Sequence, residues 1–153
     1  YLKLSYQAVL LQPYYENLTS SVIKTPKSFM VDVGLLRQMS GFWGEISGEI
    51  YESYVVSEIY KWIKTNQSNE EIYFYRTRSG LEIDLLIKTE KGIIGIEIKS
   101  SQKIDSSDCR PLSDIADKLQ GRWVGGICIY RGNKIQKVSA EKNIWLIPSY
   151  RLF

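Results

Sequence analysis

The sequence contains no histidine and only two cysteines among its 153 residues. Without histidine, the chain cannot build the usual Ser-His-Asp or Cys-His catalytic site, or a metal site with histidine ligands. Cys109 and Cys128 are too few for a four-cysteine zinc site or a disulfide framework, and we expect both to be packing residues in a reducing cytoplasm. Any metal must therefore be held by oxygen atoms, which favours Mg²⁺, Mn²⁺ or Ca²⁺.

The sequence also lacks a long apolar run and a strong imbalance of charge. No apolar segment approaches the ~20 residues of a membrane-spanning helix, and the chain starts without a signal-peptide pattern, so we expect a cytoplasmic protein with no membrane partner. The 20 basic and 17 acidic residues give a net charge of +3, which permits a nucleic-acid partner without requiring one. Because the chain begins with tyrosine rather than methionine, we expect it to be a fragment of a longer protein.

Patterns typical of strands and helices alternate along the chain. The start predicts a hairpin, with strands at 7–12 and 27–32 joined through a turn at 17–21, followed by a short helix at 34–39. The strongest helical periodicity covers 47–64. Short segments rich in β-branched and aromatic residues predict further strands, and a proline followed by a later glycine brackets a second long helix. These strands are expected at 72–76, 81–88, 93–99, 123–130, 134–138 and 143–148, and the helix at 111–119.

This order of elements predicts an α/β fold. A mixed sheet would form the central layer of a three-layer core, with helices on both sides and the N-terminal β-hairpin added to it. We divide the chain into residues 1–40, a wing-like hairpin and short helix that would continue from a region upstream, and residues 41–153, which would form the core domain.

Two acidic residues and a lysine on neighbouring predicted strands form the sharpest pattern in the sequence. Side chains alternate between the faces of a strand, so Asp84 lies opposite the apolar face of its strand. Glu97 and Lys99 share one face of the next strand, for the same reason. If the turn between the strands is 89–92, Asp84 lies directly opposite Glu97. Two carboxylates and an ammonium group would then meet on one patch of the sheet.

Such a patch is suited to a divalent cation. Two carboxylates this close repel each other unless a cation lies between them, and Mg²⁺ in proteins is commonly held by carboxylates and water on phosphate substrates. The cation could polarise a phosphoryl oxygen, while Lys99 orients or activates the attacking water. The alternative is a solvated strand face that carries a cross-strand ion pair.

The helix predicted at 47–64 offers a third carboxylate. Glu52 lies on the same stripe as Ile59 and Ile63, which should pack on the sheet, and an unpaired carboxylate on such a stripe is costly. Glu58 is the competing candidate on this helix, although it could equally be an exposed charge. We expect Glu52 rather than Glu58 to face Asp84.

Three segments resemble the PD-(D/E)xK nuclease superfamily. They are Gly48-x-x-Tyr51-Glu52-x-Tyr54-Val55, Ser79-Gly80-x-Glu82-Ile83-Asp84 and Glu97-Ile98-Lys99-Ser100. Their order is similar to that in archaeal Holliday-junction resolvases, although Ile83 stands where the superfamily signature names proline. The resemblance implies a restriction-endonuclease-like core at 41–153 that uses Mg²⁺ or Mn²⁺. The residues that it assigns are Glu52, Asp84 and Glu97 for metal binding, and Asp84, Glu97 and Lys99 for catalysis.

Over most of its length, the chain looks still more like a C-terminal domain appended to bacterial and archaeal AAA-type ATPases. The matching segments are Lys24-Thr25-Pro26-Lys27-x-Phe29-x-x-Asp32-x-Gly34-Leu35, the Glu52 helix, Tyr75-Arg76-Thr77, the Asp84 segment, Glu97-x-Lys99-Ser100-Ser101 and Ile147-Pro148. This resemblance implies an ATPase domain upstream in the same polypeptide, because the chain has no Gly-x-x-x-x-Gly-Lys-Ser/Thr loop. It implies a nuclease acting on DNA or RNA. The alternative is an inactive nuclease-like fold that serves the ATPase as an interaction module.

Four further basic residues are candidates for contacts with nucleic acid. Arg76 and Arg78 precede the strand at 81–88, and arginine forks match phosphate oxygens. Lys24 and Lys27 lie on the predicted hairpin, where they could touch a duplex backbone. Each of the four could equally be a solvated surface charge. The sequence leaves open whether the chain forms a homo-oligomer.

Overall fold

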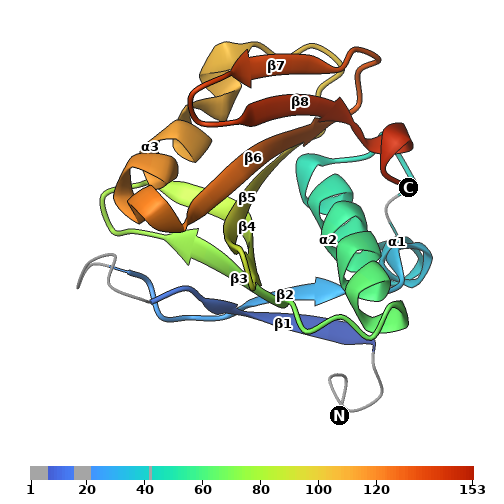
Figure 1. Cartoon of the computed structure of the whole chain (residues 1–153). Coiled ribbons are helices and arrows are strands. Elements are labelled where there is room, and N and C mark those ends of the chain that lie inside the picture. Colours follow the sequence, from blue (N-terminus) through green and yellow to red (C-terminus); the bar gives the residue numbers. More distant parts are fainter. Residues whose placement is uncertain (1–6, 16–21, 42) are drawn as a thin grey trace.

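The computed structural model describes residues 7–15, 22–41 and 43–153. Within these ranges, eight strands form one mixed sheet in the order β2-β1-β3-β4-β5-β6-β8-β7 (Figure 1). The strands are β1 (Ala8–Pro13), β2 (Lys27–Met30), β3 (Glu71–Arg76), β4 (Glu82–Thr89), β5 (Gly92–Lys99), β6 (Trp123–Tyr130), β7 (Gln136–Ser139) and β8 (Ile144–Pro148). The helices are α1 (Val33–Ser40), α2 (Gly48–Thr65) and α3 (Arg110–Leu119), with short 3₁₀ turns η1 (Ser106–Cys109), η2 (Gln120–Arg122) and η3 (Ser149–Arg151).

This architecture confirms the predicted α/β fold with a central mixed sheet between helices. The hairpin of β1 and β2 is part of that sheet, because β1 also pairs in parallel with β3 through Gln12 and Tyr73. The turn predicted at 17–21 lies outside the described residues. None of the helices in the described ranges has the length and apolar character needed to cross a membrane.

Helix α2 covers one face of the sheet. It begins after Ser47, whose hydroxyl oxygen accepts a hydrogen bond from the Ile50 N–H at 3.3 Å and so satisfies one of the free donors of the first turn. Its buried stripe includes Val55, Ile59 and Ile63, which lie in a cluster with aliphatic side chains of β4, β5 and β6. This face is a dry apolar core.

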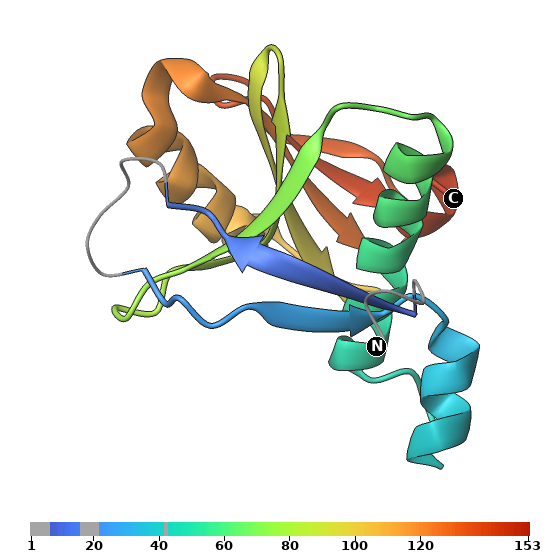
Figure 2. The same ribbon diagram turned by 90° about the horizontal axis from the view of Figure 1, so that it is seen from below.

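Helix α3 covers the opposite face (Figure 2). Its apolar side places Leu112 and Ile115 in a cluster with β4, β6 and β8. Cys109 and Cys128 lie buried in the same cluster as free thiols, in agreement with their predicted packing role. Gly95 on β5 is required here, because a Cβ atom at this position would come 2.7 Å from Cη2 of the Trp123 ring.

The hairpin of β4 and β5 has the register that the predicted turn requires. Lys88 pairs with Ile93, and the last pair of the ladder is Leu85 with Ile96. One step further along, the Ile98 N–H donates a hydrogen bond of 2.8 Å to Oδ2 of the Asp84 side chain. The backbone ladder therefore ends at Asp84, and an aspartate side chain meets the neighbouring strand at that point.

Candidate functional site

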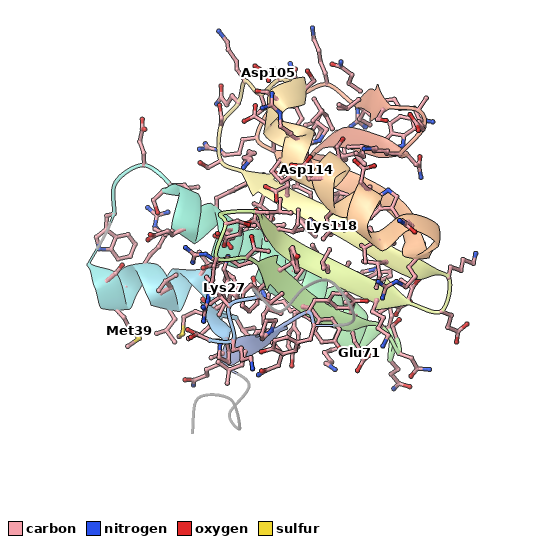
Figure 3. All side chains as sticks on the ribbon, turned by 90° about the vertical axis from the view of Figure 1, so that its left-hand side faces the viewer. Lys27, Met39, Glu71, Asp105, Asp114 and Lys118 are labelled. Atoms are coloured by element: carbon pink, nitrogen blue, oxygen red, sulfur yellow. The ribbon has the colours of Figure 1, made fainter. Side chains whose placement is uncertain are left out.

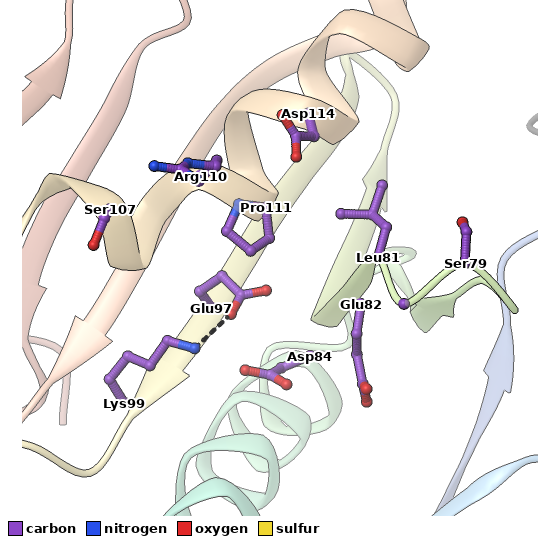
Figure 4. Close-up of a pocket in the computed structure, with 11 residues that line it drawn as sticks. Ser79, Leu81, Glu82, Asp84, Glu97, Lys99, Ser107, Arg110, Pro111 and Asp114 are labelled. Atoms are coloured by element: carbon purple, nitrogen blue, oxygen red, sulfur yellow. Dashed lines mark ion pairs between the residues drawn. The ribbon is translucent and has the colours of Figure 1, made fainter.

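A pocket of about 760 Å³ lies between the start of β4, the end of β5 and the start of α3 (Figure 4). Glu82 and Asp84 line it from β4, and Glu97 and Lys99 line it from β5. Its charged lining residues are Glu82, Asp84, Glu97, Lys99, Arg110 and Asp114. Four carboxylates against two basic groups leave the lining with an excess of negative charge, which favours a cation in the pocket.

The structure brings Asp84, Glu97 and Lys99 into this one pocket. Figure 4 shows the three side chains directed towards the same space, with the Lys99 ammonium nitrogen 3.2 Å from Oε2 of Glu97. Asp84 is anchored by its bond from Ile98. The predicted geometric convergence is therefore present, while the chemical roles of the three residues stay predictions.

Glu97 is the most unusual of these groups. Its side chain is only 4% exposed, and among the described residues its Oε1 atom has no hydrogen-bond partner. Burial, followed by the charge of Asp84, raises the pKa of Glu97 to about 8. Because an unsatisfied buried carboxylate oxygen costs free energy, it is a good ligand for a hard cation that would satisfy it. The donor set of the pocket therefore fits Mg²⁺ or Mn²⁺.

The pKa values of Asp84 and Lys99, which lie in the same pocket as Glu97, are also shifted. Burial, with the charge of Glu52 adding to it, raises the pKa of Asp84 to about 6, although the bond from Ile98 acts against this shift. Burial alone would lower the pKa of Lys99, but the charge and hydrogen bond of Glu97 raise it above its usual value. Lys99 therefore stays an ammonium group at neutral pH, and near this pH the carboxylates can exchange a proton for a cation.

Glu52 faces the carboxylate cluster from α2, as predicted. Its charge is one of the causes that raise the pKa of Asp84. Glu58 instead forms an ion pair of 2.8 Å with Lys61, one turn further along the same helix. The helical periodicity therefore gave the correct choice between the two acids, since Glu52 shares its stripe with Ile59.

Lys27 holds Glu52 in a way that the sequence analysis did not anticipate. Its ammonium nitrogen lies 3.3 Å from Oε1 of Glu52 and 2.6 Å from Oε1 of Glu82. Among the described residues, no group of three or more carboxylates or cysteines is close enough to share a metal ion. The predicted three-ligand set of Glu52, Asp84 and Glu97 is thus not assembled as one group in the part of the chain that the structure describes, and Glu52 is paired with Lys27 instead.

The other predicted nucleic-acid contacts divide into paired and exposed residues. Arg76 contacts Glu82 with its Nε atom 3.3 Å from Oε2, and Lys27 is also engaged in ion pairs, with only 23% of its side chain exposed. Lys24 and Arg78 are exposed at the surface. Lys27 therefore lies at the acidic cluster and not, as predicted, on a free wing of the hairpin.

Arg110 is a pocket residue that sequence reasoning missed. It opens α3 and lines the pocket together with Glu97 and Lys99. Its only signal was a basic residue directly before Pro111, at the start of a helix that follows the strand with Glu97. The packing of that helix against β5 could not be read from the local pattern.

A comparison with family models gives one match. Residues 47–152 match the family described as "Domain of unknown function (DUF4143)". The matched range is more than half of the chain and includes Glu52, Asp84, Glu97 and Lys99, whereas Lys27 precedes it. A comparison with curated proteins finds no match.

Proposed function

The chain belongs to the DUF4143 domain family, and we propose that it is a PD-(D/E)xK-type nuclease domain that hydrolyses phosphodiester bonds in DNA or RNA with Mg²⁺ or Mn²⁺. The observation that carries this proposal is the buried Glu97, which has an unpartnered oxygen and lines one pocket with Asp84 and Lys99. We further propose, from the resemblance of the chain, that the domain works beside an ATPase domain of the same polypeptide.

The cation would be held by Asp84 and Glu97. Oδ2 of Asp84 and Oε2 of Glu97 already have partners, so Oδ1 of Asp84 and Oε1 of Glu97 are the oxygens left for it. When bound, the cation supplies positive charge that polarises a phosphoryl oxygen. Its presence would also offset the cost of burying the two carboxylates, which raises the pKa of both, and the charge of Asp84, which raises the pKa of Glu97 further.

Lys99 and Arg110 act on the substrate side. A water oxygen forms a bond to phosphorus, the bond from phosphorus to the leaving nucleoside oxygen breaks, and the two protons of the water end on the leaving oxygen and in solvent. Lys99 orients the water or stabilises the developing phosphate charge as a hydrogen-bond donor, because its raised pKa keeps it protonated. Arg110 would position a phosphate at the pocket wall.

The test is a cleavage assay with linear, branched and single-stranded DNA and with RNA, in Mg²⁺, Mn²⁺ and EDTA. We expect cleavage that requires the metal and that Asp84→Asn reduces by about a thousand-fold, because the variant keeps the shape of the side chain but loses its charge. The matched control is Glu58→Gln on the helix surface. In EDTA the melting temperature of Asp84→Asn should stay level or rise, since carboxylate repulsion is relieved. The absence of both cleavage and metal-induced stabilisation would contradict the proposal.

A second candidate function is an interaction module without catalysis. It is favoured by the ion pairs of Lys27 with Glu52 and of Lys99 with Glu97, because these lysines already neutralise part of the acidic cluster. In that case the cluster is a structural network. Asp84→Asn would then strongly destabilise the protein in EDTA, and Mn²⁺ would leave its melting temperature unchanged.

A further inference from the structure

Lys27 reaches the acidic cluster from the edge of the sheet. It is the first residue of β2, which pairs with β1, and β2 also contacts α2. In Figure 3, Lys27 lies within the outline of the molecule, whereas Met39 projects at its margin. The ammonium group bridges Glu52 on α2 and Glu82 on β4. The ammonium group of Lys27 thus joins α2 to β4, and it reaches the pocket through Glu82, which lines it.

The oxygens of the cluster are divided between two kinds of partner. Lys27 takes one oxygen each from Glu52 and Glu82, and Arg76 takes the second oxygen of Glu82. On the other side of the cluster, Glu97 keeps a buried oxygen that lacks a partner among the described residues. The side of Glu52 and Glu82 is therefore neutralised by Lys27 and Arg76, while within the described ranges the side of Asp84 and Glu97 has only the ion pair of Lys99 with Glu97.

We propose that Lys27 occupies the place of a second divalent cation and limits the site to one ion, held by Asp84 and Glu97. In centres with two metal ions the ions lie about 4 Å apart, so a second ion would need free carboxylate oxygens beside the first. An ammonium nitrogen 2.6 Å from Glu82 uses those oxygens and repels a divalent ion at short range. This inference rests on the proposed function, because it assumes that the first ion binds.

The ammonium group of Lys27 adds a fixed positive charge to the site that a bound metal ion would otherwise supply. A lysine cannot polarise a phosphoryl oxygen as a Lewis acid, so Lys27 supplies charge without a second reactive centre. It keeps Glu52 and Glu82 paired whether or not the first ion is present. Removing its charge should release Oε1 of Glu52 and Oε1 of Glu82 as ligands, while Arg76 keeps its contact with Oε2 of Glu82.

The experiment measures Mn²⁺ binding to the whole chain by calorimetry and by electron paramagnetic resonance. Lys27→Met removes the charge and keeps most of the side-chain length. Lys61→Met is the matched control, because it breaks the ion pair with Glu58 on the outside of the same helix. Lys27→Arg preserves the charge. We expect one Mn²⁺ ion per chain for the wild type, Lys61→Met and Lys27→Arg, and two for Lys27→Met.

A measurement of thermal stability shows whether Lys27→Met is folded, so that a change in Mn²⁺ binding can be interpreted. Lys27→Met removes the ion pair of Glu52 and leaves Glu82 with Arg76 alone, so it should melt at a lower temperature than the wild type in EDTA and gain more from Mn²⁺ than Lys61→Met does. One ion with unchanged affinity in Lys27→Met would overturn the inference and leave the proposed function standing. If the wild type bound no ion and Lys27→Met bound one, the proposed metal-dependent function would be overturned. Lys27 would then be the cation that takes the place of the metal ion in the wild type. No binding by any of the proteins would overturn both.

Discussion

The side chains of strand β5 point alternately to the two faces of the sheet. Towards α2 it presents Ile96 and Ile98, which are 3% and 8% exposed, and towards α3 it presents Glu97, which is 3% exposed. Equal burial has opposite energetic consequences on the two faces, because apolar burial stabilises the fold and burial of a carboxylate opposes it. The difference teaches that a deeply buried acid with an unsatisfied oxygen indicates a ligand site, whereas equally buried neighbours indicate only packing.

The comparison is tested most strongly by substituting one buried residue on each face of β5. Ile96→Ala should lower the free energy of unfolding by about 3 kcal/mol, because it leaves a cavity in the α2 face. Glu97→Gln, measured in EDTA at pH 8, should leave stability unchanged or raise it, since it removes a buried charge. Urea denaturation of both variants checks this. A loss of stability in Glu97→Gln as large as that in Ile96→Ala would show that both faces are structural.

The pH dependence of stability sharpens the comparison. The pKa of Glu97 is raised from 4.5 to about 8 in the folded protein. Between these values the folded chain holds a proton that the unfolded chain has lost, so the stability due to this group is complete below about pH 4.5 and is lost as pH rises towards 8. In EDTA, the wild type should therefore lose on the order of 2 kcal/mol relative to Glu97→Gln between pH 5 and 8.5.

The measurement is a series of urea transitions for both proteins at matched ionic strength. The difference between wild type and Glu97→Gln isolates the contribution of this carboxyl from that of the other acidic residues. Parallel curves for the two proteins would mean that Glu97 ionises normally in the folded state.

The smallest expected effect concerns Arg110, at the end of α3 that borders the pocket. Arg110→Ala should raise the KM for a nucleic-acid substrate about tenfold with little change in kcat, because it removes a phosphate contact and leaves the carboxylates intact. The control is Lys118→Ala near the other end of α3, which should have no effect on KM. Equal KM values for the two variants would remove Arg110 from the substrate site.

Local patterns were sufficient to predict the side of the site that β4 and β5 build. The two-residue alternation placed Asp84 with Glu82 on one face, and the turn before Gly92 fixed the register between the strands. The helical period separated Glu52 from Glu58 because a helix repeats its faces every 3.6 residues. These features depend only on neighbours in the sequence, and the structure agrees with the register and with the choice of Glu52. The alternation along β4 is interrupted, because Ile83 packs with Leu86 in the α3 cluster while Leu85 packs in the α2 cluster.

The side of the site built by Lys27 could not be predicted in this way. Its contact with Glu82 depends on the parallel pairing of β1 with β3, which joins residues far apart in the sequence. A shift of register between Tyr73 and Tyr75 on β3 also adjusts the start of β4. Neither the choice of neighbour in the sheet nor a bulge has a reliable local signal. From the sequence, Lys27 is therefore a candidate for contact with nucleic acid or a surface charge, and its ion pairs with the acidic residues are not predicted.

The hydrogen bond from the Ile98 N–H to Asp84 makes one amide a spectroscopic reporter of the site. The Ile98 side chain belongs to the apolar α2 face, while its amide proton is held by a carboxylate oxygen that borders the pocket. Protonation of Asp84, or a cation beside it, changes the charge on that oxygen and hence the strength of the bond. In a ¹⁵N-labelled sample, the shift of this single resonance should follow the charge state of the pocket without any substrate.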